Sequence, residues 1–128
     1  MAINLLPFFL HLVIKCGERR VVVVVRVSRQ TRWASEEQRS WTVHRIQRKW
    51  KRDIVMLEHF PAGDLPPEWI VVVTGTGDTL AASILASLVQ NLRRFEDPEL
   101  LKETVEDAQV AAALTLKSEY TVSPSLSL

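Results

Sequence analysis

The sequence has little of the residues that mark some protein classes: among 128 residues there are one cysteine, four glycines and one tyrosine. The single cysteine, Cys16, cannot form an internal disulfide, and no cysteine or histidine cluster has the spacing of a zinc site. The sequence therefore predicts no metal site made by the protein alone. A reducing, cytoplasmic compartment fits it best.

The chain also lacks an excess of charge of either sign, because 16 basic residues nearly balance 15 acidic ones. The net charge therefore does not indicate which class of partner the protein binds. The opening stretch, residues 3–14, is mostly apolar, but it contains Asn4, Pro7 and His11 and is shorter than the ~20 apolar residues that span a bilayer. No basic residue precedes it and no small-x-small cleavage pattern follows it, so we expect neither a membrane span nor a secretory signal.

What is present is enough apolar material for one domain, since 47% of the residues are hydrophobic. Leu10–Lys15 and the unbroken β-branched run Val21–Val25 predict two strands joined by the turn at residues 17–20. Apolar side chains on both faces of the second strand are typical of a central strand in an α/β sheet that helices cover on both sides. The alternative is that residues 5–12 include the end of a connection that crosses over into the first of these strands, because a parallel strand needs such a crossover.

Two further strands are predicted downstream, Asp53–Phe60 and Trp69–Val73. The proline-rich connection Pro61–Pro67 lies between them, and its prolines argue against a helix there.

Two helices follow these strands. Residues 79–92 are apolar or small almost all round, which predicts a helix buried closely against a sheet. Asp97, Pro98 and Glu99 supply an N-cap, a proline at the first helical position and an acid in the first turn. They predict the start of a second helix, which runs to about Lys117.

Residues 28–52 form a basic, tryptophan-bearing excursion between the second and third predicted strands. Its basic residues are Arg29, Arg32, Arg39, Arg45, Arg48, Lys49, Lys51 and Arg52, and its tryptophans are Trp33, Trp41 and Trp50. Cations that follow phosphates and rings that stack on bases are the two ingredients of single-strand nucleic-acid binding. No nucleic-acid motif occurs there, and Glu36 and Glu37 interrupt the positive charge. We favour a solvated loop whose tryptophans pack on the domain, with a nucleic-acid-binding module as the alternative.

The turn Thr74–Gly77, followed by Asp78, carries the clearest sign of chemistry. Its glycines let successive N–H groups converge, and a helix N-terminus adds donors and partial positive charge, which predicts an anion hole at Gly75, Thr76 and Gly77. An aspartate held ionised beside those donors can take a proton from a hydroxyl while the amides stabilise a phosphoryl group. The simpler alternative is a tight turn in which Asp78 caps the helix.

Residues 74–82, Thr-Gly-Thr-Gly-Asp-Thr-Leu-Ala-Ala, resemble the second signature of the ribokinase-like (PfkB) carbohydrate kinases, a Thr-Gly-Ala-Gly-Asp followed by a small-residue helix. Residues 12–23 are similar to the family's strand-turn-strand element V-K-x-G-x-x-G-V, which precedes the nucleotide site. Residues 108–116 resemble the last helix, which helps enclose the adenine. The endings at residues 118–119 and 122–124 are particularly like the pseudouridine kinase branch.

The resemblance implies that residues 1–128 are a single, partial PfkB domain: the C-terminal half of a ribokinase-like α/β fold, with a partial sheet covered by helices. It implies ATP-dependent phosphorylation of a sugar or nucleoside hydroxyl, with magnesium bridging the phosphates. The implied roles are Asp78 as catalytic base, Gly75, Thr76 and Gly77 as anion hole, and Lys15, Gly17 and Ala112 as nucleotide-binding residues.

The sequence departs from the family pattern at Arg20, which replaces the second turn glycine, and at Val72, where relatives often have asparagine. Residues 28–52 match nothing in the family, whose members are much longer and whose N-terminal part supplies the sugar pocket and lid. We therefore expect the isolated chain to be inactive, to need that missing part as its partner, and to self-associate through an apolar strand edge at Val21–Val25. A non-catalytic relic is the alternative.

Overall fold

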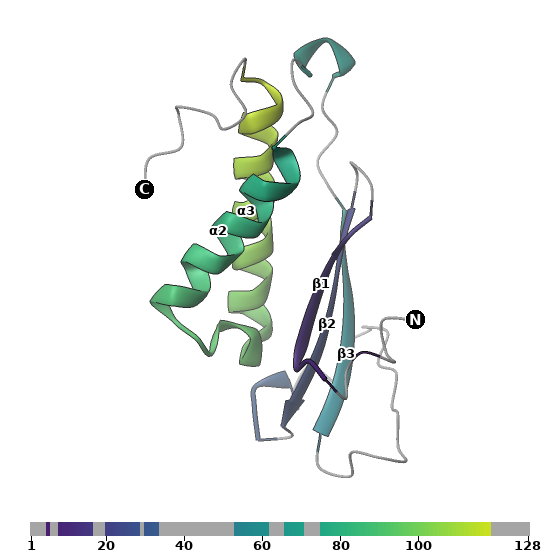
Figure 1. Cartoon of the computed structure of the whole chain (residues 1–128). Helices are drawn as coiled ribbons and strands as arrows, with labels where there is room; N and C mark the ends of the chain where they lie inside the picture. Colours follow the sequence, from purple (N-terminus) through teal and green to yellow (C-terminus); the bar gives the residue numbers. More distant parts are fainter. Residues whose placement is uncertain are drawn as a thin grey trace.

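A computed structural model of the chain describes residues 5, 8–16, 20–28, 30–33, 53–61, 66–70 and 75–118. Its elements are β1 (His11–Lys15), β2 (Arg20–Ser28), β3 (Asp53–Pro61), the 3₁₀-helix η2 (Pro67–Trp69), α2 (Thr76–Gln90), the 3₁₀-helix η3 (Arg94–Glu96) and α3 (Pro98–Leu116). The strands form one antiparallel sheet beside the pair of α-helices, so the fold mixes α and β elements (Figure 1). Gly17, Val72, Thr74 and most of the basic excursion lie outside the described residues.

β2 is the middle strand of this sheet. It pairs antiparallel with β1, where Val21 lies opposite Lys15, and with β3, where Val21 lies opposite Phe60. The predicted pair of strands is confirmed, and the pair is antiparallel. Because β2 is paired along both edges, the expected exposed strand edge at Val21–Val25 does not exist. Val23–Val25 are also buried, through packing on the faces of the sheet.

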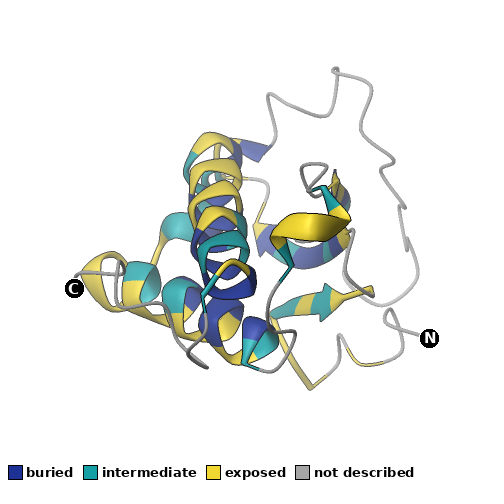
Figure 2. Cartoon of the chain, turned by 90° about the horizontal axis from the view of Figure 1, so that it is seen from above, coloured by how far each residue is buried: buried dark blue, intermediate teal, exposed yellow. Residues whose placement is uncertain are grey.

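Both described helices pack on the same face of the sheet (Figure 1). The core between them and the sheet contains Val21, Val23, Val25, Val27, Met56 and Phe60 from the strands and Leu80, Ile84, Leu101, Val105, Ala108 and Ala112 from the helices. Figure 2 shows buried residues, in dark blue, on both the helices and the sheet. The other face carries a smaller cluster around Val24 and Val55, which no described helix joins.

The expectation of helices on both faces is therefore wrong for the described part of the chain. Helices cover both faces of a sheet when they serve as crossovers between parallel strands. The strands here are antiparallel neighbours, so their connections impose no such crossover.

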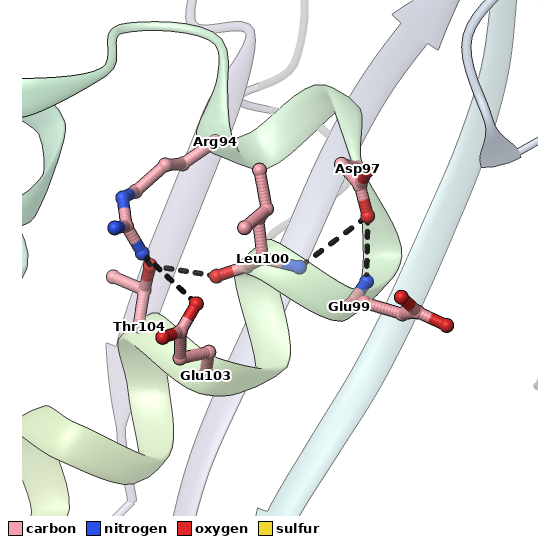
Figure 3. A network of polar contacts seen from close by, with 6 residues as sticks. All are labelled: Arg94, Asp97, Glu99, Leu100, Glu103 and Thr104. Atoms are coloured by element: carbon pink, nitrogen blue, oxygen red, sulfur yellow. Dashed lines mark hydrogen bonds and ion pairs between the residues drawn. The ribbon is translucent and has the colours of Figure 1, made fainter.

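α3 begins as its sequence predicts. A side-chain oxygen of Asp97 accepts hydrogen bonds from the N–H groups of Glu99 at 2.9 Å and Leu100 at 3.3 Å, and Pro98 follows the cap (Figure 3). The second oxygen of Asp97 lies 2.7 Å from a guanidinium nitrogen of Arg32. One carboxylate thus caps the helix and connects it to the segment that follows β2.

Arg94 of η3 contacts the second turn of α3: its guanidinium donates to the hydroxyl of Thr104 at 3.1 Å and lies 3.4 Å from Glu103 (Figure 3). The Thr104 hydroxyl in turn donates to the carbonyl oxygen of Leu100 at 2.7 Å. This network joins η3 to α3 and holds the short connection between the two helices.

α2 differs from its prediction in two ways. It begins at Thr76 rather than Thr79, because the turn ends at Gly75 and the Thr-Gly-Asp segment is already helical. It is also not buried all round, since Leu85 and Val89 are 62% and 81% exposed. Apolar composition predicted burial on every side, but the described part of the molecule covers one face of this helix.

The fourth predicted strand does not start at Trp69, because this residue ends η2. Proline at the beginning of η2 is compatible with a helical turn, since the first turn of a helix leaves its N–H groups without helical partners. The rest of that predicted strand lies outside the described residues. In the described part of the chain, no helix has the length and apolar character that crossing a membrane requires.

We predict that Asp97→Ala lowers the free energy of unfolding by about 1–2 kcal/mol at pH 7, because the helix loses its cap and Arg32 loses its partner. Burial alone would raise the pKa of Asp97, but the hydrogen bonds from Arg32, Leu100 and Glu99 outweigh it and hold this pKa below the ordinary 3.8. A carboxyl group with a lowered pKa stabilises the fold above pH 3.8, and that stabilisation is lost as the pH falls through the lowered pKa.

Urea denaturation at pH 7 and between pH 4 and 2 measures both effects. The variant should lose stability at pH 7 and respond less to acid than the wild type, whereas Glu99→Ala, which removes an exposed carboxylate of the same turn, should change little. An unchanged acid response in Asp97→Ala would contradict this assignment.

Candidate functional site at the start of helix α2

The turn into α2 is made by Gly75, whose backbone is left-handed with φ 87° and ψ −10°. Among the described residues no other has a positive φ. The carbonyl oxygen of Gly75 accepts the N–H of Thr79 at 2.9 Å, the first hydrogen bond of the helical ladder. The N–H groups of Gly77 and Asp78 precede that bond, so they have no acceptor within the helix. They make the start of α2 an electropositive end that suits an anion.

Asp78 lies in this first turn with an exposed side chain. It does not cap the helix, because the cap is Gly75 and no side chain accepts a capping hydrogen bond there. The simpler interpretation of Asp78 as a cap is therefore wrong. Its carboxylate stands at the electropositive end of α2 and is accessible from outside.

Lys15 reaches the same turn from the end of β1. A Cβ atom added to Gly77 would lie 3.9 Å from both Cδ and Nζ of Lys15. The strand register explains the approach: Lys15 is opposite Val21, a residue of the face on which the helices pack. The fold thus brings together Lys15 and Gly77, two predicted site residues far apart in sequence, and adds a cation to the helix end.

A buried pair of hydroxyl groups holds this turn in place. The side-chain oxygens of Thr79 and Thr115 are 3.0 Å apart, and both residues are buried. The Thr115 hydroxyl donates to the carbonyl oxygen of Ala111 at 3.3 Å, which leaves Thr79 as donor to Thr115. The start of α2 is therefore fixed against the last turns of α3.

The other predicted site residues are placed differently. Ala112 is 7% exposed and belongs to the core between the helices and the sheet, so its side chain does not line an open surface. Gly17 lies outside the described residues.

Sequence reasoning missed two residues at this end of α3. The ammonium of Lys117, at the C-cap of α3, lies 4.5 Å from the ring centroid of Trp69, which is half exposed. No sequence signal predicts the pair, because its partners are separated by both helices. Since Thr115 contacts the start of α2, Lys117 brings a second cation to the end of the molecule that holds Asp78.

A separate groove of about 600 Å³ lies at the other end of β1 and α2. Its charged and titratable lining residues are His11, Arg26, Arg32, Arg93, Glu96 and Asp97. His11 is four strand residues from Lys15, about 13 Å along an extended chain, so this groove is not part of the Asp78 site.

The charges of this groove are largely compensated from within. Arg32 pairs with Asp97 and Arg93 with Glu96, each at 2.7 Å. Burial lowers the pKa of His11 although Glu96 acts to raise it, and the imidazole packs edge-on against Phe95 with 5.2 Å between centroids. These contacts stabilise the packing of the strands against the helices, so we take the start of α2 as the candidate functional site. In the described part of the chain, no three histidine, cysteine or carboxylate side chains gather as metal ligands.

No protein-family model, curated protein or solved structure matches the chain. The function must therefore be inferred from the residues at the start of α2.

Alanine substitutions at the two turn glycines should have opposite effects on the stability of the fold. Gly75→Ala should destabilise the fold by about 1–2 kcal/mol, because a Cβ atom is strained at a left-handed φ. Gly77→Ala should leave stability unchanged or raise it by up to about 1 kcal/mol, because alanine favours a helix and its Cβ would meet Lys15 only at ordinary contact distance. Thermal and urea unfolding measure the difference, and equal losses in both variants would contradict the turn geometry.

Proposed function

We propose that this chain is the C-terminal, nucleotide-binding and catalytic part of a ribokinase-like carbohydrate kinase of the cytoplasm, one that phosphorylates a sugar or nucleoside hydroxyl with ATP. The observation that carries this proposal is the meeting of three features at the start of α2. They are the amide groups after the left-handed Gly75, the ammonium of Lys15 beside Gly77, and the exposed carboxylate of Asp78.

The phosphates of the nucleotide suit the positive side of this arrangement. The N–H groups of Gly77 and Asp78 and the end of the helix dipole favour an anion, and Lys15 adds a full positive charge beside them. Proteins catalyse phosphoryl transfer mostly by positioning the reactants and by stabilising the developing charge. An anion hole of this kind stabilises the negative charge of the transferring group.

Asp78 supplies the complementary function of a general base. As the acceptor oxygen bonds to the γ-phosphorus, its hydroxyl proton passes to the carboxylate of Asp78, while the bond to the β,γ-bridging oxygen breaks and ADP leaves. Asp78 is in the same turn as the amide donors, so the base and the anion hole act on neighbouring atoms.

Magnesium, when bound, would neutralise the phosphate charge. A magnesium ion in such sites is held mostly by phosphates and water with one or two carboxylates, so the single carboxylate Asp78 is compatible with it.

The acceptor pocket is proposed to come from a further N-terminal part of the kinase domain. The groove described above lies at the far end of β1 and α2, away from Asp78. An acceptor hydroxyl must be held in line with the γ-phosphate, and that requires groups other than those at the start of α2.

The competing proposal, a nucleic-acid module on residues 29–52, finds less support where the structure describes that segment. Trp33 is 1% exposed and its indole N–H donates to the carbonyl oxygen of Phe95 at 2.9 Å, so it packs in the core instead of offering a stacking surface. Arg32 is paired with Asp97. These contacts are those of a tryptophan that packs on the domain.

We predict that the chain binds magnesium-ATP or ADP and that Gly77→Asp abolishes binding, because a carboxylate would occupy the anion hole. Gly77→Ala is the matched control and should bind, and Lys15→Ala should weaken affinity about tenfold through loss of one charge-assisted contact. Calorimetric titration measures all four proteins.

The outcome that would reverse the proposal is oligonucleotide binding without nucleotide binding. Such binding should show a steep salt dependence and be lost on replacing Arg45, Arg48, Lys49 and Arg52.

We further predict that the isolated chain does not turn over a sugar substrate, because nothing at Asp78 orients the acceptor. In a parent protein that carries the N-terminal part, Asp78→Asn keeps the shape but removes the base. It should lower the rate by about 10² to 10⁴ with little change in nucleotide affinity. Coupled ADP-release assays and titrations measure these two quantities, and full activity of the variant would refute the role of Asp78.

A further inference from the structure

The groove of about 600 Å³ at the start of β1 has no role in the proposed function. It lies between the start of β1, the end of β2 and the connection from α2 to α3. Small-molecule sites in proteins have volumes of about 300–1,000 Å³ and combine apolar walls with a few convergent polar groups. Leu10, Val27 and Leu100 provide apolar walls here, and the other lining residues carry hydrogen-bonding side chains. The groove therefore has the size and the lining of a site for a small molecule.

The charge of the groove favours an anion. Its lining contains three arginines and two carboxylates, namely Arg26, Arg32, Arg93, Glu96 and Asp97. Three positive charges against two negative charges leave an excess of one positive charge when His11 is neutral. Asp97 already uses both of its oxygens, one for the amides at the start of α3 and one for Arg32. An oxygen of Glu96 accepts from Arg93. The acidic groups thus have internal partners, and the charge in excess is positive.

Arg93 and Asn91 supply the hydrogen-bond donors that are left over. Arg93 contacts Glu96 through Nε at 2.7 Å, and a guanidinium carries its other N–H donors on two terminal nitrogens. Among the residues that the structure describes, no other hydrogen bond or ion pair engages those terminal nitrogens. Asn91 accepts the backbone N–H of Arg93 with Oδ1 at 3.0 Å, so its amide nitrogen remains a donor. Both side chains line the groove, and both ask for an acceptor.

We propose that this groove binds a small organic anion through a carboxylate or phosphate group, with Arg93 and Asn91 as the residues that bind the anionic group. Two terminal nitrogens of a guanidinium match two oxygens of a carboxylate or phosphate, and the contact of Nε with Glu96 orients them. The walls made by Leu10 and Leu100 contact the organic part of the ligand. This site is separate from the start of α2, so the proposal does not depend on the proposed kinase activity.

His11 makes the site sensitive to pH. Its ring lines the groove and packs edge-on against Phe95, with 5.2 Å between centroids. Burial lowers the pKa of His11, and Arg26 lowers it further, whereas Glu96 and the carbonyl group of Leu10 act to raise it.

The other charged groups that face the groove are Arg32, Arg93 and Asp97. An anion bound among them adds negative charge near the imidazole and raises its pKa, so His11 should take up a proton when the anion binds. Binding should therefore strengthen as the pH falls through the raised pKa.

An NMR titration of the full chain with citrate and with pyrophosphate tests the site. At least one of the two anions should bind saturably, and their relative affinities distinguish a carboxylate site from a phosphate site. The amide signals of residues 26–32 and 91–97 should shift, whereas the neutral polyol sorbitol should leave them unchanged. Shifts confined to residues 75–79, or no saturable binding below about 10 mM, would overturn the proposal.

Arg93→Gln should weaken the binding of that anion about tenfold or more, because the variant loses the charge and the paired donors. Lys102→Gln is the matched control, since it removes a positive charge from an exposed position of α3 outside the groove and should change little. Circular dichroism verifies that both variants are folded. Equal losses in the two variants would show attraction by overall charge and contradict the site. Arg93→Gln should keep its affinity for magnesium-ATP, which separates this result from the proposed function.

The imidazole signals give a readout that needs no variant. In the free protein His11 should titrate below 6.5, and its pKa should rise when the groove is saturated with the anion that binds. His59, which is exposed on β3 and outside the groove, is the internal reference and should not respond to the anion. An unchanged pKa of His11 would place the anion outside the groove and overturn the proposal.

Discussion

The candidate site depends on the contacts that fix the first turn of α2 against β1 and α3. Thr79 bonds to Thr115 inside the core, and Lys15 reaches Gly77 from the edge of the sheet. The turn itself has little to hold it locally, because no side chain caps α2. Its position is therefore set by packing, and the direction of its amide groups follows from that packing.

This constraint explains why the carboxylate and the cation are on different sides of the turn. Lys15 extends from the face of the sheet on which the helices pack, whereas Asp78 is on the exposed side of α2. In the proposed kinase, a phosphate at the helix end would have Lys15 toward the protein and the carboxylate of Asp78 on the outside. The same outward position of Asp78 places it on the exposed side of α2, together with Leu85 and Val89.

The two faces of α2 therefore differ in their surroundings. The inner face, with Leu80 and Ile84, completes the core, and the outer face is apolar without a described neighbour. A helix with apolar residues on all sides is normally enclosed, and this one is enclosed on one side by the described residues. Composition therefore does not tell which face of α2 is buried; the packing of the inner face against the sheet and α3 does.

The sequence by itself determined the features that depend on near neighbours. The antiparallel strand pair around Val21–Val25 follows from β-branched residues on both sides of a short turn, and the start of α3 follows from Asp97 and Pro98. The glycines of residues 74–77 likewise predicted a turn before α2, although the helix begins at Thr76, earlier than the predicted Thr79.

Tertiary structure alone decided which distant residues meet and which apolar faces are covered. Lys15 comes to Gly77, and Thr79 to Thr115, only because the strand register and the helix packing place them together. Composition did not predict that α2 is buried on one face only. Nor did it predict that both helices pack on one face of the sheet. The physical reason is that local preferences act over a few residues, whereas coverage depends on where the whole chain can pack.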